Sequence, residues 1–185
     1  AGDLGLSLAP LGKAPAGAAR LRAPRVGLYK PWAASIDEGW TRFLLERYGF
    51  APVSLDNAAI RAGKLGGRFD VVVLPDLEKE VIATGKPKRE EGEPSYFPEP
   101  RPEYAGGLGK EGAAALREFV DGGGTLVALA SASEYLVEEL GLPVRNALVK
   151  AKADEFLCPG SLVRIDVAAA HPVTFGLPPS LPAFV

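Results

Sequence analysis

Short apolar segments alternate with longer segments of helical periodicity up to about residue 140. The apolar segments are rich in aliphatic side chains and lie at residues 25–29, 52–55 and 69–75. The last of them contains an unbroken β-branched run, which is typical of a strand buried on both faces in a parallel sheet. Residues 37–48 carry side chains at helical spacing, and Gly49 is expected to end that helix. The spaced residues are Trp40, Phe43, Leu44 and Arg47.

A polar and proline-rich segment at 77–109 interrupts this alternation. The helical period resumes at 112–120 and leads into a fourth strand that starts at Thr125. Strands that alternate with helices at this spacing predict an α/β fold, with a doubly wound, mostly parallel sheet flanked by helices.

The two ends of the chain have other patterns. Residues 1–23 are rich in Ala, Gly, Leu and Pro without a sustained period, so we expect a linker or docking arm there, followed by a domain at 24–185. Near Val144 we expect a short strand, and the alternation at 161–167 predicts a half-exposed strand. The stretch at 171–179 has turn chemistry with apolar anchors.

Composition narrows the possible functions. With 185 residues, of which 47% are hydrophobic, the chain is long enough to bury a continuous core. The net charge is -2 and the basic residues are dispersed, so nucleic acid is not an expected partner. No segment approaches the roughly 20 apolar residues of a membrane span. The one cysteine excludes an internal disulfide, and the absence of methionine indicates a piece of a longer protein.

A strand-to-helix turn at residues 122–136 holds the first candidate chemistry. In α/β hydrolytic folds such a turn carries a nucleophile between small residues, in a G-x-S-x-G or G-x-C-x-G frame. Here the same frame reads Ala128-Leu129-Ala130-Ser131-Ala132. The turn therefore has the small neighbours of a nucleophile elbow, while its central side chain is a methyl group.

This turn resembles that of class I glutamine amidotransferase-like domains, in which an elbow cysteine opens a helix that ends in Leu-Gly. Counting back from Leu140-Gly141 places Ala130 at the nucleophile position. A methyl group cannot attack a carbonyl, so the resemblance implies a flavodoxin-like, amidotransferase-like fold without amidotransferase chemistry.

Four phrases extend the resemblance over about residues 24 to 185. They are Glu103–Gly109, Phe119–Val127, Cys158–Leu162 and His171–Pro178. In this order they are similar to the amidotransferase-like domain that follows the peptidase domain in a group of bacterial zinc carboxypeptidases. The resemblance implies a catalytically inert accessory domain with a structural, docking or targeting role, a peptidase domain of the same parent chain as its partner, and a secreted or periplasmic location in bacteria.

The resemblance also fixes where zinc is expected. Carboxypeptidases of this kind hold zinc with two histidines and a glutamate. The chain has one histidine, so we expect no metal site and no cofactor in it, and zinc only in the peptidase domain of the parent chain. The oligomeric state is left open by the sequence.

An alternative from the enzyme class is a hydrolase or amidase that uses Ser131 or Cys158 with His171. Amidotransferase triads place a glutamate two residues after the histidine, whereas Val173 stands there in this chain. The simpler interpretation of Ser131, or of Ser133, is a helix N-cap. Cys158 has neither a helix N-terminus nor an adjacent cation to activate it, which favours a packing role.

A second alternative is a stand-alone module that binds a small polar ligand. The turn after the first strand lacks the glycines of a dinucleotide site. It still lies at the carboxyl ends of the strands, where open α/β sheets bind ligands. The polar residues expected to gather there are Lys30, Trp32, Ser35, Asp76, Ser131 and Glu134. A purely structural interpretation remains open, in which Trp32 packs on the surface, Asp76 caps a turn and Lys30 pairs with a carboxylate. Aromatic docking anchors are a third possibility, at Trp32, Tyr96 and Tyr104.

Overall fold

The computed structural model describes residues 10, 12–13, 15–18, 22–87, 99–148, 151–152, 154–158, 160–168 and 170–184. The chain divides into two compact units, Ala1–Pro143 and Val144–Val185. Each unit is described by itself.

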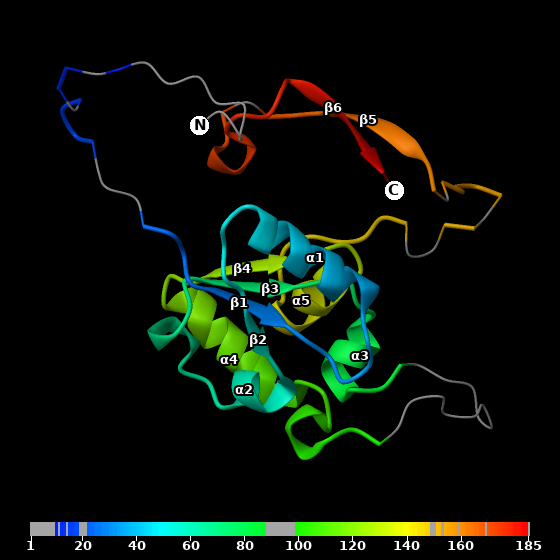
Figure 1. The fold of residues 1–185 in the computed structure, drawn as a ribbon. Helices are drawn as coiled ribbons and strands as arrows, with labels where there is room; N and C mark the ends of the chain where they lie inside the picture. The colour runs from blue at the N-terminus through cyan, green and yellow to red at the C-terminus, as the bar shows by residue number, and fades with distance from the viewer. Residues whose placement is uncertain are drawn as a thin grey trace. The chain divides into compact units, whose positions relative to one another are not determined.

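The first unit is built on a sheet of four parallel strands in the order β2-β1-β3-β4 (Figure 1). The strands are β1 (Val26–Tyr29), β2 (Val53–Leu55), β3 (Val71–Leu74) and β4 (Thr125–Ala128). The first crossover places β2 on one side of β1, and the second crossover passes β1 and places β3 on its other side. The predicted doubly wound, parallel α/β fold is confirmed, and the direction of winding reverses between β1 and β3.

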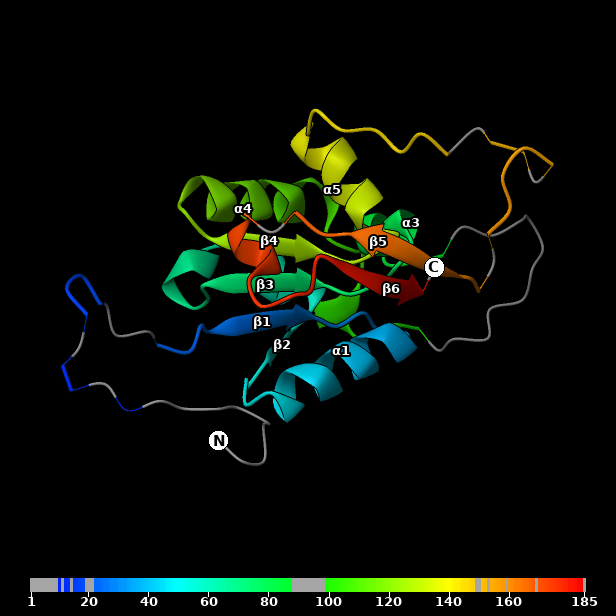
Figure 2. The same ribbon diagram turned by 90° about the horizontal axis from the view of Figure 1, so that it is seen from above.

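Helices cover both faces of this sheet (Figures 1 and 2). They are α1 (Ile36–Arg47), α2 (Asn57–Arg61), α3 (Lys79–Thr84), α4 (Gly109–Asp121) and α5 (Ala132–Leu140), with short 3₁₀ turns η2 (Leu65–Gly67) and η3 (Pro102–Tyr104). The larger apolar cluster joins the sheet to α2, α3, α4 and α5, through buried side chains such as Ile60, Ile82, Leu116 and Leu136. A smaller cluster of Val26, Leu28 and Val73 packs against Leu45 of α1.

Helix α1 turns a polar side toward the sheet. Glu38 is only 8% exposed and accepts a 2.6 Å hydrogen bond from Arg42. Arg42 also donates to the Pro52 carbonyl and the Ser54 hydroxyl beside it on β2. Four of the five apolar side chains of this helix, Ile36, Trp40, Phe43 and Leu44, are exposed by half or more, as is Tyr48 just after it, whereas Leu45 packs on the sheet. We call the five exposed residues the α1 apolar face.

The segment before β1 is tied to the sheet. Both guanidinium nitrogens of Arg22 donate to Asp70 at 2.7 Å, and Arg25 donates to the same carboxylate from its side chain and its backbone. Asp70 immediately precedes β3. Arg22, near the end of the predicted 1–23 linker, is thus hydrogen-bonded to the residue that precedes β3.

The predicted elements correspond closely to the strands and long helices of this unit, and the differences are local. Helices α2 and α3 were not predicted, because five and six residues are too few to show a helical period. Helix α3 and η3 lie in the segment 77–109 that was expected to interrupt the fold. Residues 88–98 of that segment, including Tyr96, lie outside the described residues.

The second unit contains a two-stranded antiparallel ribbon. Strand β5 (Leu162–Asp166) confirms the strand predicted at 161–167, and it pairs with β6 (Ser180–Phe184), which was not predicted. Between them, η4 (Pro172–Thr174) lies in the stretch expected to form turns. The short strand expected near Val144 is absent, since residues 142–148 form turns and irregular backbone.

Candidate functional site

The turn between β4 and α5 has an unusual backbone at Ala130. Its φ is 42°, and among the described non-glycine residues only Lys64 also has a positive φ. A side chain in this left-handed region costs about 1–3 kcal/mol, and such strain is the backbone signature of a nucleophile elbow. Here the strained residue carries a methyl group, which offers no reactive atom at this turn.

The two serines of this turn do not cap α5 with their side chains. Ser131 occupies the N-cap position, but its hydroxyl makes no capping hydrogen bond, and the Ser133 hydroxyl donates back to the Ala130 carbonyl at 2.6 Å. Asp76, which follows β3, accepts a 3.0 Å hydrogen bond from the Ser131 backbone N–H instead. Asp76 therefore caps the turn, as the structural interpretation of that residue expected.

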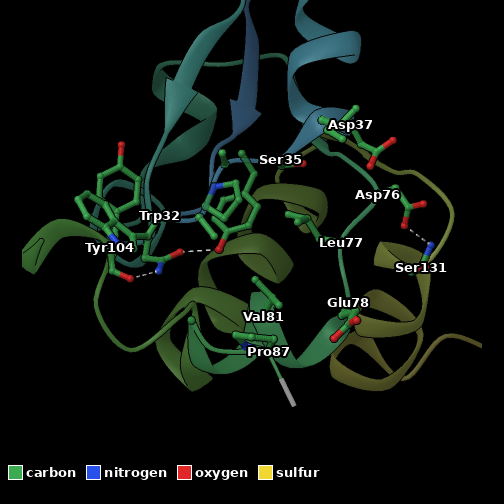
Figure 3. A pocket seen from close by; sticks show the side chains of 17 residues that line it. Trp32, Ser35, Asp37, Asp76, Leu77, Glu78, Val81, Pro87, Tyr104 and Ser131 are labelled. Atoms are coloured by element: carbon green, nitrogen blue, oxygen red, sulfur yellow. Dashed lines mark hydrogen bonds between the residues drawn. The ribbon is translucent and has the colours of Figure 1, made fainter. Parts of the chain in front are cut away.

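A pocket of about 430 Å³ opens where β1 and β3 end (Figure 3). This is the point at which the winding of the sheet reverses, and open α/β sheets bind ligands there. The volume lies within the range of small-molecule sites. The lining residues named below come from the end of β1, the β1–α1 turn, the start of α1, α2, the β3–α3 turn, α3, η3 and the N-cap of α5.

A chain of hydrogen bonds fixes one side of the pocket. The Tyr29 hydroxyl donates to the Asn57 side-chain oxygen at 2.6 Å, and the Asn57 amide nitrogen donates to the Tyr104 carbonyl at 2.5 Å. Tyr29 and Asn57 are both buried, and burial raises the pKa of the Tyr29 phenol. These bonds join β1, α2 and η3, so the side chains in contact with the cavity are held by the core behind them.

Aromatic and acidic side chains lie on different sides of the cavity. Trp32 and Tyr104 pack with ring centroids 5.4 Å apart and an interplanar angle of 51°. In Figure 3 these rings lie on one side, the carboxylates of Asp37 and Asp76 lie on the other, and Leu77 stands between them. A third acidic residue, Glu78, also lines the cavity, whereas no lysine or arginine does so among the described residues.

The structure brings together four of the six ligand-binding candidates. Trp32, Ser35, Asp76 and Ser131 line the main pocket, and Ser35 also caps α1 by accepting a hydrogen bond from the Glu38 N–H. Lys30 lines a smaller adjoining pocket of about 270 Å³, and it makes no ion pair with any described residue. Glu134 lies in the first turn of α5 and lines neither of these two pockets.

Several lining residues were missed by sequence reasoning. Asn57 and Val81 belong to the short helices that were not predicted, and Asp37 and Glu78 are polar residues at the N-termini of α1 and α3. Tyr104 was singled out as a docking anchor, but its ring packs on Trp32 at the pocket. The sequence signal that could have found Asp37 and Glu78 is their position directly after the turns that follow β1 and β3.

The remaining catalytic candidates belong to the second unit. The His171 ring nitrogen Nδ1 accepts a 3.2 Å hydrogen bond from the Val173 N–H and thereby caps η4. Cys158 is partly buried and unbridged. Within the described ranges, no three His, Cys, Asp or Glu side chains form a group that could hold a metal ion, and no helix is long and apolar enough to cross a membrane.

The strand order, the helices on both faces and the pocket at the reversal of winding define an open, doubly wound α/β domain. Comparison with protein-family models finds no matching family, and comparisons with curated proteins and with solved structures find no significant match.

Proposed function

We propose that the chain is a catalytically inert, amidotransferase-like accessory domain of a larger zinc metallocarboxypeptidase, in which it docks to the peptidase domain of the same parent chain. The observation that supports the proposal is Ala130, whose positive φ is expected of a strained strand-to-helix turn, while its methyl side chain offers no nucleophile. The resemblance of the sequence phrases supplies the peptidase partner, its zinc ion and a secreted or periplasmic location in bacteria.

The α1 apolar face supports the docking role. Trp40 is 61% exposed and Phe43 52% exposed, and their rings make an edge contact at 5.8 Å. Ile36, Trp40, Phe43, Leu44 and Tyr48 recur at helical spacing, so they form one stripe along the helix. A contiguous exposed stripe with two large aromatic rings is typical of a surface that another protein covers.

The inert character is tested on the 185-residue chain with glutamine and with an activated ester as substrates. We expect no hydrolysis above buffer, and no change on Ser131→Ala or His171→Ala. Hydrolysis that either substitution abolishes would support the alternative enzyme and overturn the proposal.

The docking role is tested in the full-length parent chain. We expect Trp40→Ser with Phe43→Ser to lower the melting temperature of the peptidase domain while leaving that of the isolated chain within about 2 °C, because both side chains are exposed here. Val120→Ser, a partly exposed apolar residue of α4, is the matched control. A peptidase domain whose melting temperature is unchanged would show that this face does not dock to it.

A further inference from the structure

The pocket at the end of β1 and β3 has features that the docking role does not use. It is a cavity of defined volume, not an exposed patch, and it is formed by side chains whose positions the core determines. Asn57 is 1% exposed and uses both ends of its amide on Tyr29 and Tyr104. The pocket is therefore pre-formed, which is the usual state of a small-molecule site.

We propose that this pocket binds an organic cation that carries an apolar body, an ammonium or guanidinium group attached to an aromatic or aliphatic frame. The inference is independent of the docking role, since the pocket and the α1 apolar face share only Ile36.

Charge defines the head group. Three carboxylates, from Asp37, Asp76 and Glu78, line the cavity. Asp76 accepts one backbone N–H through Oδ1, and neither Asp37 nor Glu78 forms an ion pair with a described residue. The N-termini of α1, α3 and α5 also lie at this pocket, because Asp37, Glu78 and Ser131 stand at them, and each carries a partial positive charge of roughly half a unit. Together these partial charges are smaller than three full negative charges, so the potential in the pocket favours a cation.

The basic residues nearby do not reverse this balance. Lys30 lines the adjoining cavity instead of this one. The Arg101 guanidinium lies 5.7 Å from the Trp32 ring centroid but is not a lining residue.

The walls define the rest of the ligand. Trp32 and Tyr104 are tilted by 51° and both rings contact the cavity, while Leu77 and Val81 add aliphatic surface. Because rings and carboxylates lie on different sides, a ligand with a charged end and an apolar end satisfies both at once (Figure 3). A phosphate or carboxylate ligand would meet like charges and gain nothing from the rings.

The test compares three probes of nearly equal shape: phenethylammonium, 2-phenylethanol and 3-phenylpropionate. The 185-residue chain has two tryptophans, so the Trp40→Phe variant leaves Trp32 as the fluorescent reporter. We expect phenethylammonium to change the Trp32 fluorescence saturably. Its dissociation constant should be about five- to tenfold below that of 2-phenylethanol, because the attraction of roughly one unit charge near a half-exposed carboxylate is of this size. The carboxylate should bind more weakly than the alcohol.

Charge-neutralising variants identify the residues responsible. Glu78→Gln and Asp37→Asn should each raise the dissociation constant for phenethylammonium several-fold and leave that for the alcohol unchanged. Glu111→Gln, on the first turn of α4 and away from the pocket, is the matched control and should change neither. Far-UV circular dichroism confirms that each variant is folded. Equal binding of the alcohol and the ammonium ion, tighter binding of the carboxylate, no saturable binding of any probe, or neutral variants without effect would each overturn the inference.

Discussion

Two buried tyrosines of the first unit should respond in opposite ways to the same substitution. Tyr29 is 0% exposed and Tyr135 is 2% exposed. The Tyr29 hydroxyl donates to Asn57 at 2.6 Å, whereas the Tyr135 hydroxyl is buried and has no hydrogen-bond partner among the described residues. Replacement by phenylalanine removes one oxygen atom from each site and leaves the ring in place.

The expected changes in the free energy of unfolding depend on which polar groups stay buried after each substitution. Tyr29→Phe leaves the Asn57 side-chain oxygen buried without its donor, which costs about 1–3 kcal/mol. The Tyr135 hydroxyl is buried without a hydrogen bond, which destabilises the folded state. Tyr135→Phe removes this hydroxyl, so the free energy of unfolding should stay equal or rise by up to about 1 kcal/mol. We expect the two variants to differ by about 1–4 kcal/mol.

Urea denaturation followed by tryptophan fluorescence measures this difference, because Trp32 and Trp40 both lie in the first unit. The midpoint should fall for Tyr29→Phe and stay or rise for Tyr135→Phe, at equal slopes of free energy against urea concentration. Equal losses of stability in both variants would refute the reasoning, because they would show that the two hydroxyls have equivalent hydrogen bonds.

Three further predictions concern strain and titration. Ala130→Gly should raise the free energy of unfolding by about 1 kcal/mol, since glycine adopts φ 42° without strain; a loss in urea denaturation would contradict this. Arg22 and Arg25 hold the pKa of Asp70 well below its usual range, so the stability that this carboxylate contributes is present above pH about 4 and is lost as the pH falls; Asp70→Asn should flatten that part of the profile of unfolding midpoint against pH. Burial raises the pKa of Tyr29, so stability should be complete below pH about 10 and fall above it; absorbance at alkaline pH should show Tyr29 ionising together with unfolding, and ionisation in the folded state would contradict this.

The strands and long helices could be predicted because their local patterns agree with their burial. The β-branched run at 71–74 is buried in the middle of the sheet, and the period at 109–121 matches a helix with one apolar side. Helix α1 shows the limit of this reasoning. Its period predicted a helix correctly. However, the Glu38–Arg42 pair and the hydrogen bonds of Arg42 near β2 lie on the side that faces the sheet, and a pattern of hydrophobic residues gives no sign of such polar contacts.

The candidate site could be predicted in outline for a topological reason. Residues that follow parallel strands meet at one edge of the sheet, which brought Trp32, Ser35, Asp76 and Ser131 to one pocket. Asn57 and Tyr104 could not be found in this way, because they meet through a hydrogen bond between segments 47 positions apart. Glu134 was expected at the pocket because it closely follows Ser131, but it does not line the cavity although it lies in the first turn of α5.

The hydrogen bonds of Asp70 to Arg22 and Arg25 have a consequence for how the domain is tethered. They fasten the chain at the point where β1 and β3 begin, and the pocket opens where the same two strands end. Each strand is four residues long, about 13 Å of extended chain. Any segment upstream of Arg22 is thus attached at the end of the sheet that lies opposite the pocket. The chain therefore enters the sheet where β1 and β3 begin, and a ligand enters the cavity where the same two strands end.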